Sequence, residues 1–246
     1  MYKKFELNKE FVGFYNTYPH YFNDNVVIKG IYGCFPSSIW NGGRRVLGSC
    51  SIEEAKEILD YFNSRNIACR YTFTNCKLEE HHLLDTFCNI CLEISYNELN
   101  EIIINSPILE RYIRSKFPNY RIISSTTKRY MDIEKILAEI KNYHMIVLDY
   151  TLNNTPELFQ LPNKDKYELL LNAYCNDFCN KRYEHYEHLS SEQLSFSKTN
   201  TFHSCPMTDD SFYHVLENRK SFIHVEDLYG KYINAGFKNF KIEGRT

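Results

Sequence analysis

Hydrophobic residues along the chain gather in short, nearly continuous apolar runs. These runs predict seven strands, at residues 25–33, 68–74, 101–106, 120–126, 145–150, 167–173 and 237–244. Runs without regular polar alternation are typical of strands that are buried on both faces. The pattern therefore indicates a parallel sheet covered by helices.

Amphipathic segments lie between the apolar runs and predict helices at 51–66, 78–91, 107–117, 131–142 and 225–236. Their ends carry recognisable signals. Ser51 and Glu54 have the spacing of a capping box, Pro107 suits a first helical turn, and Gly236 suits a helix end. Strands and helices thus alternate along most of the chain.

This alternation predicts a single domain over residues 1–246 with a (β/α) TIM-barrel-like fold, short of one unit and of the last helix. An open doubly wound sheet is the weaker interpretation, because no Gly-x-Gly-x-x-Gly follows a strand. The segment 187–221 is too long for an ordinary loop, so we expect it to be functional or partly helical.

Composition narrows the functional classes. The 246 residues are 43% hydrophobic, enough for a full core, and the net charge of −2 argues against a generally basic nucleic-acid surface. No secretion signal and no apolar run of roughly 18 residues is present in the sequence. We therefore expect a cytoplasmic protein without a membrane segment.

The nine cysteines predict reduced thiols in this setting. Four of them are candidate metal ligands, namely Cys34, Cys175, Cys179 and Cys205. Cys34 and Cys175 follow predicted strands, and Cys175 and Cys179 are four positions apart. Soft thiolates suit an iron–sulfur cluster or zinc. Zinc sites commonly use a two-residue spacing, found here at Cys88 and Cys91, so the spacing favours a 4Fe-4S cluster, with zinc or purely structural thiols as alternatives.

Polar residues also follow the predicted strands, where a barrel would place its active site. Asn41, Arg44 and Arg45 could bind an anionic substrate, since arginine fits carboxylate and phosphate groups. A solvated glycine turn is the simpler alternative for these three. Asp149 is a further candidate for substrate binding, and the candidate catalytic residues are Asn172, Arg182, His185, Glu243 and Arg245.

Two stretches, "NAYCNDFCNKRYEHY" and "EDLYGKYINAGFKNFKIEGR", resemble peptidase family U32. The resemblance implies a (β/α) barrel. It also implies oxygen-independent hydroxylation of an RNA base or a quinone ring, with a four-iron cluster on Cys34, Cys175, Cys179 and Cys205. The family name implies proteolysis instead, although the sequence carries no Gly-x-Ser-x-Gly or His-Glu-x-x-His motif.

Three functions therefore remain open. The favoured one is an oxygen-sensitive iron–sulfur oxidoreductase or hydroxylase-like enzyme that acts at the mouth of the barrel. The others are a U32-type peptidase and a non-catalytic accessory barrel with a partner subunit. The expected substrate is an anionic small molecule, a peptide or an RNA base.

Overall fold

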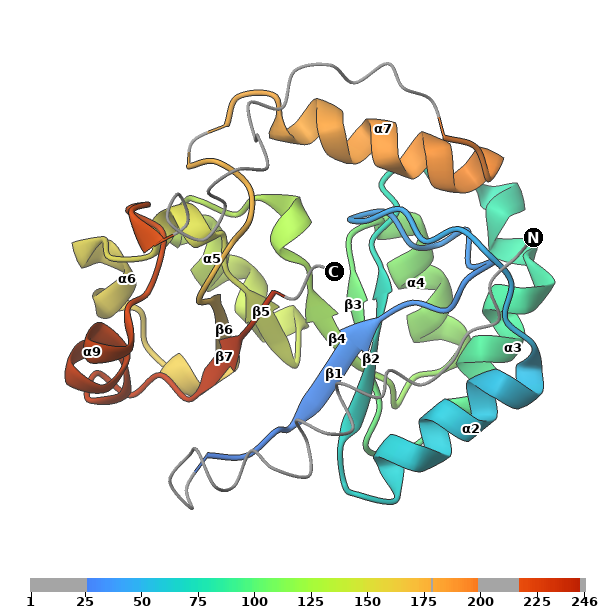
Figure 1. Ribbon diagram of the computed structural model, residues 1–246, viewed down its shortest axis with the longest axis horizontal. Coiled ribbons are helices and arrows are strands. Elements are labelled where there is room, and N and C mark those ends of the chain that lie inside the picture. The colour runs from blue at the N-terminus through green and yellow to red at the C-terminus, as the bar shows by residue number, and fades with distance from the viewer. Residues whose placement is uncertain (1–25, 178, 199–216, 244–246) are drawn as a thin grey trace.

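The computed structural model describes residues 26–177, 179–198 and 217–243, and its centre is a seven-stranded parallel sheet (Figure 1). The strands are β1 (Gly30–Gly33), β2 (Ala68–Phe73), β3 (Glu101–Ile104), β4 (Arg121–Ser124), β5 (Met145–Val147), β6 (Tyr167–Leu170) and β7 (Asn239–Lys241). Each strand pairs in parallel with the next along the chain, from β1 to β7. All seven strands were predicted, with longer bounds.

The sheet curls into a half-barrel, and helices flank its outside (Figure 1). The sequential strand order confirms the barrel-like prediction, because a doubly wound sheet would reverse its strand order part-way. Side chains link the two ends of the sheet. The Tyr32 hydroxyl of β1 donates to the Ile242 carbonyl oxygen, just beyond β7, at 3.0 Å.

The helices are α2 (Ile52–Asn63), α3 (Thr86–Ile94), α4 (Pro107–Lys116), α5 (Ile133–Glu139), α6 (Pro156–Gln160), α7 (Arg182–Ser195) and α9 (Val225–Asp227). Short 3-10 turns join them, at η2 (Glu80–Leu84), η3 (Thr126–Lys128), η4 (Ile140–Asn142), η5 (Tyr150–Leu152) and η6 (Lys164–Lys166), and a π-helical turn, η8 (Leu228–Ile233), follows α9. The capping box at Ser51 and Glu54 is formed as predicted.

Two helix predictions need correction, and a third is confirmed. The expected helix 78–91 is divided by Asp85, whose side chain caps α3 through the Cys88 amide. The expected helix 225–236 is mostly π-helical and turns at Gly236, which has a φ of 101°. The segment 187–221 is partly helical, since α7 continues to Ser195.

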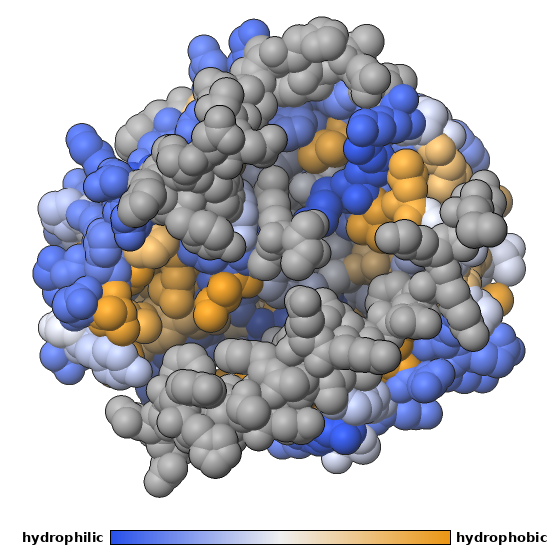
Figure 2. Space-filling model, viewed as in Figure 1, coloured by the Kyte–Doolittle hydropathy of each residue, from blue (hydrophilic) through white to orange (hydrophobic). Residues whose placement is uncertain are grey.

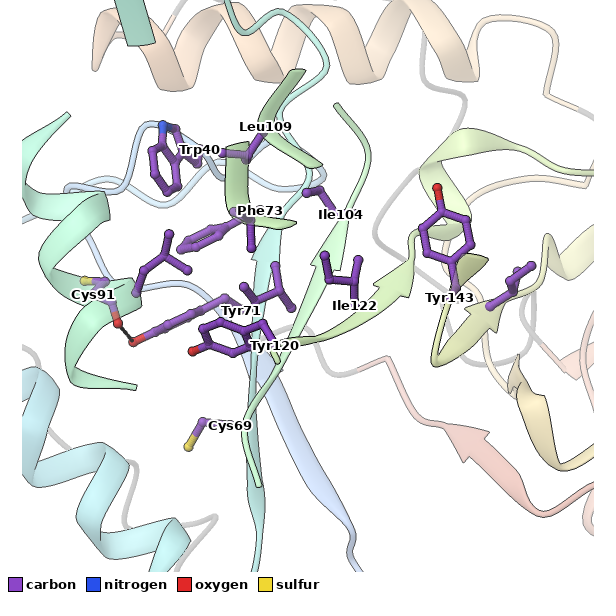
Figure 3. Close-up of a cluster of buried hydrophobic side chains, with 14 of the residues drawn as sticks. Trp40, Cys69, Tyr71, Phe73, Cys91, Ile104, Leu109, Tyr120, Ile122 and Tyr143 are labelled. Atoms are coloured by element: carbon purple, nitrogen blue, oxygen red, sulfur yellow. Dashed lines mark hydrogen bonds between the residues drawn. The ribbon is translucent and has the colours of Figure 1, made fainter. Parts of the chain in front are cut away.

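Apolar residues pack on both faces of the sheet. Ile102 and Ile104 of β3 belong to the large core beneath the helices, whereas Ile103 between them belongs to a smaller cluster on the inner face. Figure 3 shows part of the large core, where Tyr71 and Phe73 stack with ring centroids 4.9 Å apart. The alternation follows from strand geometry, which turns successive side chains to opposite faces.

Charged residues also occupy the inner face. Arg70 contacts Glu101 and Glu168, each at 2.5 Å, and Lys241 lies 3.9 Å from the second carboxylate oxygen of Glu168. The Lys241 ammonium lies 3.6 Å from the centre of the Tyr32 ring. The interior of the half-barrel thus holds both the apolar cluster around Ile103 and a charged group from β2, β3, β6 and β7.

In the space-filling view, the described residues along the rim are largely hydrophilic, and hydrophobic residues lie nearer the centre of the visible face (Figure 2). In the described part of the chain, no helix is long and apolar enough to cross a membrane.

Candidate functional site

The segment after β6 lies beside the end of β7. The Asn172 side chain donates to the Glu243 carbonyl oxygen at 3.0 Å and accepts from the Glu243 amide at 2.7 Å. One carboxylate oxygen of Glu243 accepts from the Tyr174 amide at 3.0 Å. These two predicted site residues therefore meet at the carboxyl end of the sheet, where a barrel enzyme has its active site.

Arg219 fixes the same segment from the other side. One guanidinium nitrogen, Nη1, donates to the carbonyl oxygens of Ala173, Tyr174 and Cys175, at 3.4, 2.8 and 2.6 Å. The peptide that carries Cys175 is therefore held by side chains from distant parts of the chain. Sequence reasoning missed Arg219, because it follows no predicted strand.

Asp149 and Arg182 form a buried ion pair in this region, and their side chains are 0% and 2% exposed. The other Asp149 carboxylate oxygen accepts from the Thr151 amide at 3.0 Å and from the Thr151 hydroxyl at 2.8 Å. Burial lowers the pKa of Arg182, but the Asp149 carboxylate raises it, and the resulting pKa lies above the ordinary value. Asp149 was predicted to bind substrate, and the structure places it as the group that positions Arg182.

Cys175 lies against the inner apolar cluster, close to Tyr150. Burial raises the pKa of Tyr150 above its ordinary value, and the neighbouring Cys175 thiol raises it further while Arg182 lowers it. Tyr186 of α7 has a pKa raised by the same kind of burial, with Arg182 again acting to lower it. A thiol, two phenols and a guanidinium thus share one enclosed region.

Helix α7 spans the carboxyl end of the half-barrel, over the loops that follow β1 and β2 (Figure 1). The Gln193 amide group donates to the carbonyl oxygens of Ser38 and Val46, at 2.9 and 3.0 Å. Glu192 pairs with Arg45 at 2.5 Å, which ties this predicted substrate-binding residue to the helix. His185, another predicted site residue, lies in the first turn of α7.

The remaining residues of "WNGGRR" differ in exposure. Asn41 is buried, accepts from the Thr72 hydroxyl at 2.9 Å and donates to the Arg44 carbonyl oxygen. The Arg44 side chain is 46% exposed and lies 4.0 Å from the Glu243 carboxylate. Arg44 is therefore the one of the three predicted anion-binding residues with the most open side chain.

The predicted cluster ligands lie in different surroundings. Cys34 packs against the core beneath the helices, where burial raises its pKa to about 12, while Cys175 packs against the inner cluster. Cys179 lies just before α7, which begins at Arg182. Cys205 and Arg245 lie outside the described residues.

Within the described ranges, no group of three or more histidine, cysteine, aspartate or glutamate side chains is arranged to hold a metal ion. Cys175 and Cys179 are two predicted ligands four positions apart after β6, whereas Cys34 packs against the large core and not against the inner cluster that Cys175 contacts. A complete four-thiol set is thus not assembled by the described residues.

The half-barrel is similar to a solved structure, that of the U32 peptidase Mk0906. The two share 12% sequence identity with a TM-score of 0.56, and the match covers 89% of this chain and 85% of that chain. The chain has the U32 peptidase fold. No family model matches the sequence, and no curated protein matches it.

The U32 fold accounts for the placement of the site. Its strands run parallel in chain order, so polar residues that follow β5, β6 and β7 gather at one end. Two inner residues of this fold, Glu168 and Lys241, were not predicted as part of the interior. The sequence did contain a signal for them, namely a charged residue within an apolar strand. Such a buried charge is usually paired with an opposite charge.

Proposed function

We propose that this chain is a U32-family enzyme that acts at the carboxyl-end mouth of the half-barrel and carries out iron–sulfur-dependent oxidoreductase or hydroxylase-like chemistry. The observation that supports the proposal most is the anchoring of the thiol-bearing segment. Asn172 and Glu243 hold its beginning, Arg219 holds the Cys175 carbonyl, and the Asp149–Arg182 pair holds its end. Ordinary loops need no such fixation from three sides.

Cys175 and Cys179 would hold the cluster, with Cys205 as the third candidate ligand. Cys34 is not included, because it packs beneath the helices rather than against the inner cluster. A bound cluster would supply one-electron transfer at the mouth. The chain's own residues fix the Cys175 peptide, pack its thiol against the cluster that contains Tyr150 and place the Arg182 guanidinium over the Tyr150 ring.

The test is iron and sulfide analysis of protein purified without oxygen. We expect iron and acid-labile sulfide in the wild type, and loss of both in Cys175→Ser and Cys179→Ser. The matched control is Cys76→Ser, because the Cys76 thiol also lies under α7, 3.4 Å from the Ser190 hydroxyl, and serine can keep that contact. An iron-free wild type, or equal loss of iron in the control, contradicts the proposal.

A U32-type peptidase is the second candidate, favoured by the similarity to the U32 peptidase structure. In that case the Cys175 thiol would be the nucleophile. Cleavage of gelatin or of a peptide library should then survive metal chelation and disappear in Cys175→Ala. Absence of cleavage together with bound iron would decide for the first candidate.

A further inference from the structure

The buried guanidinium of Arg182 has unused hydrogen-bond donors. Its Nη2 atom donates to Asp149, and its central carbon lies 4.5 Å from the centre of the Tyr150 ring. Nε and Nη1 are also buried, and neither has a hydrogen-bond partner among the residues that the structure describes. Since Nε carries one hydrogen and Nη1 carries two, about three N–H bonds lack an acceptor.

Such an arrangement is costly in a folded protein. A buried donor without an acceptor costs roughly 1–3 kcal/mol, and more when the group is charged. Buried polar groups therefore nearly always have a partner, and an exception calls for an explanation such as a ligand. Asp149 cannot supply it, because its other carboxylate oxygen is already used by Thr151.

The same protein contains a satisfied counterpart. Arg70 lies inside the half-barrel between two carboxylates, with Nε donating to Glu101 and Nη1 donating to Glu168. Arg182 has one carboxylate, Asp149, and its Nε and Nη1 remain open. The comparison indicates the kind of group that Arg182 lacks, which is a second anionic oxygen acceptor.

A second feature points to the same chemistry. Arg182 is the first residue of α7, a helix of 14 residues, and the Lys181 side chain does not cap it. The amino end of a helix carries a partial positive charge and favours anions. Arg44, 4.0 Å from Glu243, adds a second guanidinium at the mouth.

We propose that Arg182 is the substrate anchor of this site and binds an acidic group, a carboxylate or a phosphate, through Nε–H and Nη1–H. The inference rests on the proposed function only in placing the reaction at this mouth. The Asp149 carboxylate balances the guanidinium charge in the free protein, and the bound anion supplies the second acceptor. The acidic group would then lie beside Cys175, which contacts the same Tyr150.

The experiment is calorimetric titration of the full chain, purified without oxygen, with sodium acetate and with inorganic phosphate, each against sodium chloride of equal ionic strength. We expect at least one of the two anions to bind the wild type, and the effective one identifies the acidic group. Arg182→Lys keeps a cation beside Asp149 but loses the guanidinium fork, so binding should weaken about tenfold or more.

The matched control is Arg114→Lys. Arg114 also pairs with a carboxylate, that of Glu110 at 2.9 Å, but lies on α4 and outside the mouth. Its affinity for the anion should equal that of the wild type. Equal binding by wild type and Arg182→Lys, or binding of neither anion by the wild type, overturns the inference.

Two further measurements keep the outcome clear. If Arg182→Lys does not fold, the Nε–H resonance of Arg182 in the wild type is followed during the same titration, and an unmoved resonance overturns the inference. Iron content is measured on each sample. If the protein contains iron but anion binding does not depend on Arg182, only the role of Arg182 as substrate anchor is refuted. If Arg182-dependent anion binding occurs in a protein without iron, only the proposed iron–sulfur cluster is refuted.

Discussion

At the scale of single residues, Lys241 is a buried ionisable group with a lowered pKa. Burial lowers its pKa to about 8, and the nearby carboxylate of Glu168 offsets part of that effect. Arg70 and Arg44 lower it further, while Glu243 raises it. An ammonium held in this way is stabilised chiefly by one carboxylate and one aromatic face, that of Tyr32.

A pH dependence of stability follows from this lysine. The unfolded chain binds the proton up to its ordinary pKa of 10.5, whereas the folded chain releases it near pH 8. Between these values the unfolded state carries more protons, so the contribution of Lys241 to the free energy of unfolding rises with pH. The rise should be on the order of 2–3 kcal/mol.

Urea unfolding of the wild type and of Lys241→Met, at several pH values from 7 to 10.5, measures this contribution. It is the difference between the free energies of unfolding of the two proteins. The difference cancels the thiols and phenols, which titrate in both. Lys231→Met is the control, because Lys231 is exposed and pairs with Asp227 at 2.7 Å. Parallel curves for the wild type and Lys241→Met would show that the assigned titration is wrong.

The sequence predicted part of the arrangement at this scale. Asn172, Glu243 and Asp149 were expected at one edge because parallel strands end there, and the structure brings the first two into contact. The pairing of Asp149 with Arg182 was not predictable. It depends on how α7 returns across the sheet, and no local pattern encodes that path.

At the scale of elements, α7 shows why the bounds of one helix were not predicted. Three of its buried residues make polar contacts instead of entering an apolar core. The Ser190 hydroxyl accepts from the Cys76 amide, Glu192 pairs with Arg45, and Gln193 donates to loop carbonyl oxygens. Helix prediction from sequence relies on an apolar stripe. A helix that docks through hydrogen bonds has no such stripe, so 187–221 looked irregular.

The docking of α7 predicts the effect of one glycine. A β-carbon at Gly42 would lie 2.3 Å from the Asn75 Cα atom and 2.8 Å from the Ser190 hydroxyl. Gly42→Ala should therefore push α7 away from the loops and lower the free energy of unfolding by about 1–3 kcal/mol. Gly33→Ala is the control, because nothing lies within 4 Å of its β-carbon. Denaturant unfolding measures both, and equal stability of the two variants contradicts the packing described.

At the scale of the whole molecule, the curl of the sheet brings its first and last strands into contact. Tyr32 of β1 makes two interactions with the β7 end of the chain, a hydrogen bond to the Ile242 carbonyl oxygen and a ring contact with Lys241. The strand order was predictable from the alternation of elements. The side chains that join β1 to β7 were not, because they are far apart in sequence.

The two interactions can be separated by mutation. Tyr32→Phe removes the hydrogen bond alone and should cost about 1 kcal/mol. Tyr32→Leu also removes the aromatic face beneath Lys241, worth roughly another 0.5–2 kcal/mol. Urea unfolding measures the series, with Tyr229→Leu, an exposed position, as the control. If Tyr32→Phe is as unstable as Tyr32→Leu, the ring contact contributes nothing.

The chain-ordered sheet has a kinetic consequence. Each strand pairs with the strand just formed, so most contacts can arise between neighbouring units soon after they leave the ribosome, whereas Tyr32 and Ile242 are separated by 210 positions. Contacts of such long range are the slowest to form, because a large loop must close first. We expect the β1–β7 junction to assemble after the rate-limiting step. Weakening it should then speed unfolding and leave the refolding rate almost unchanged.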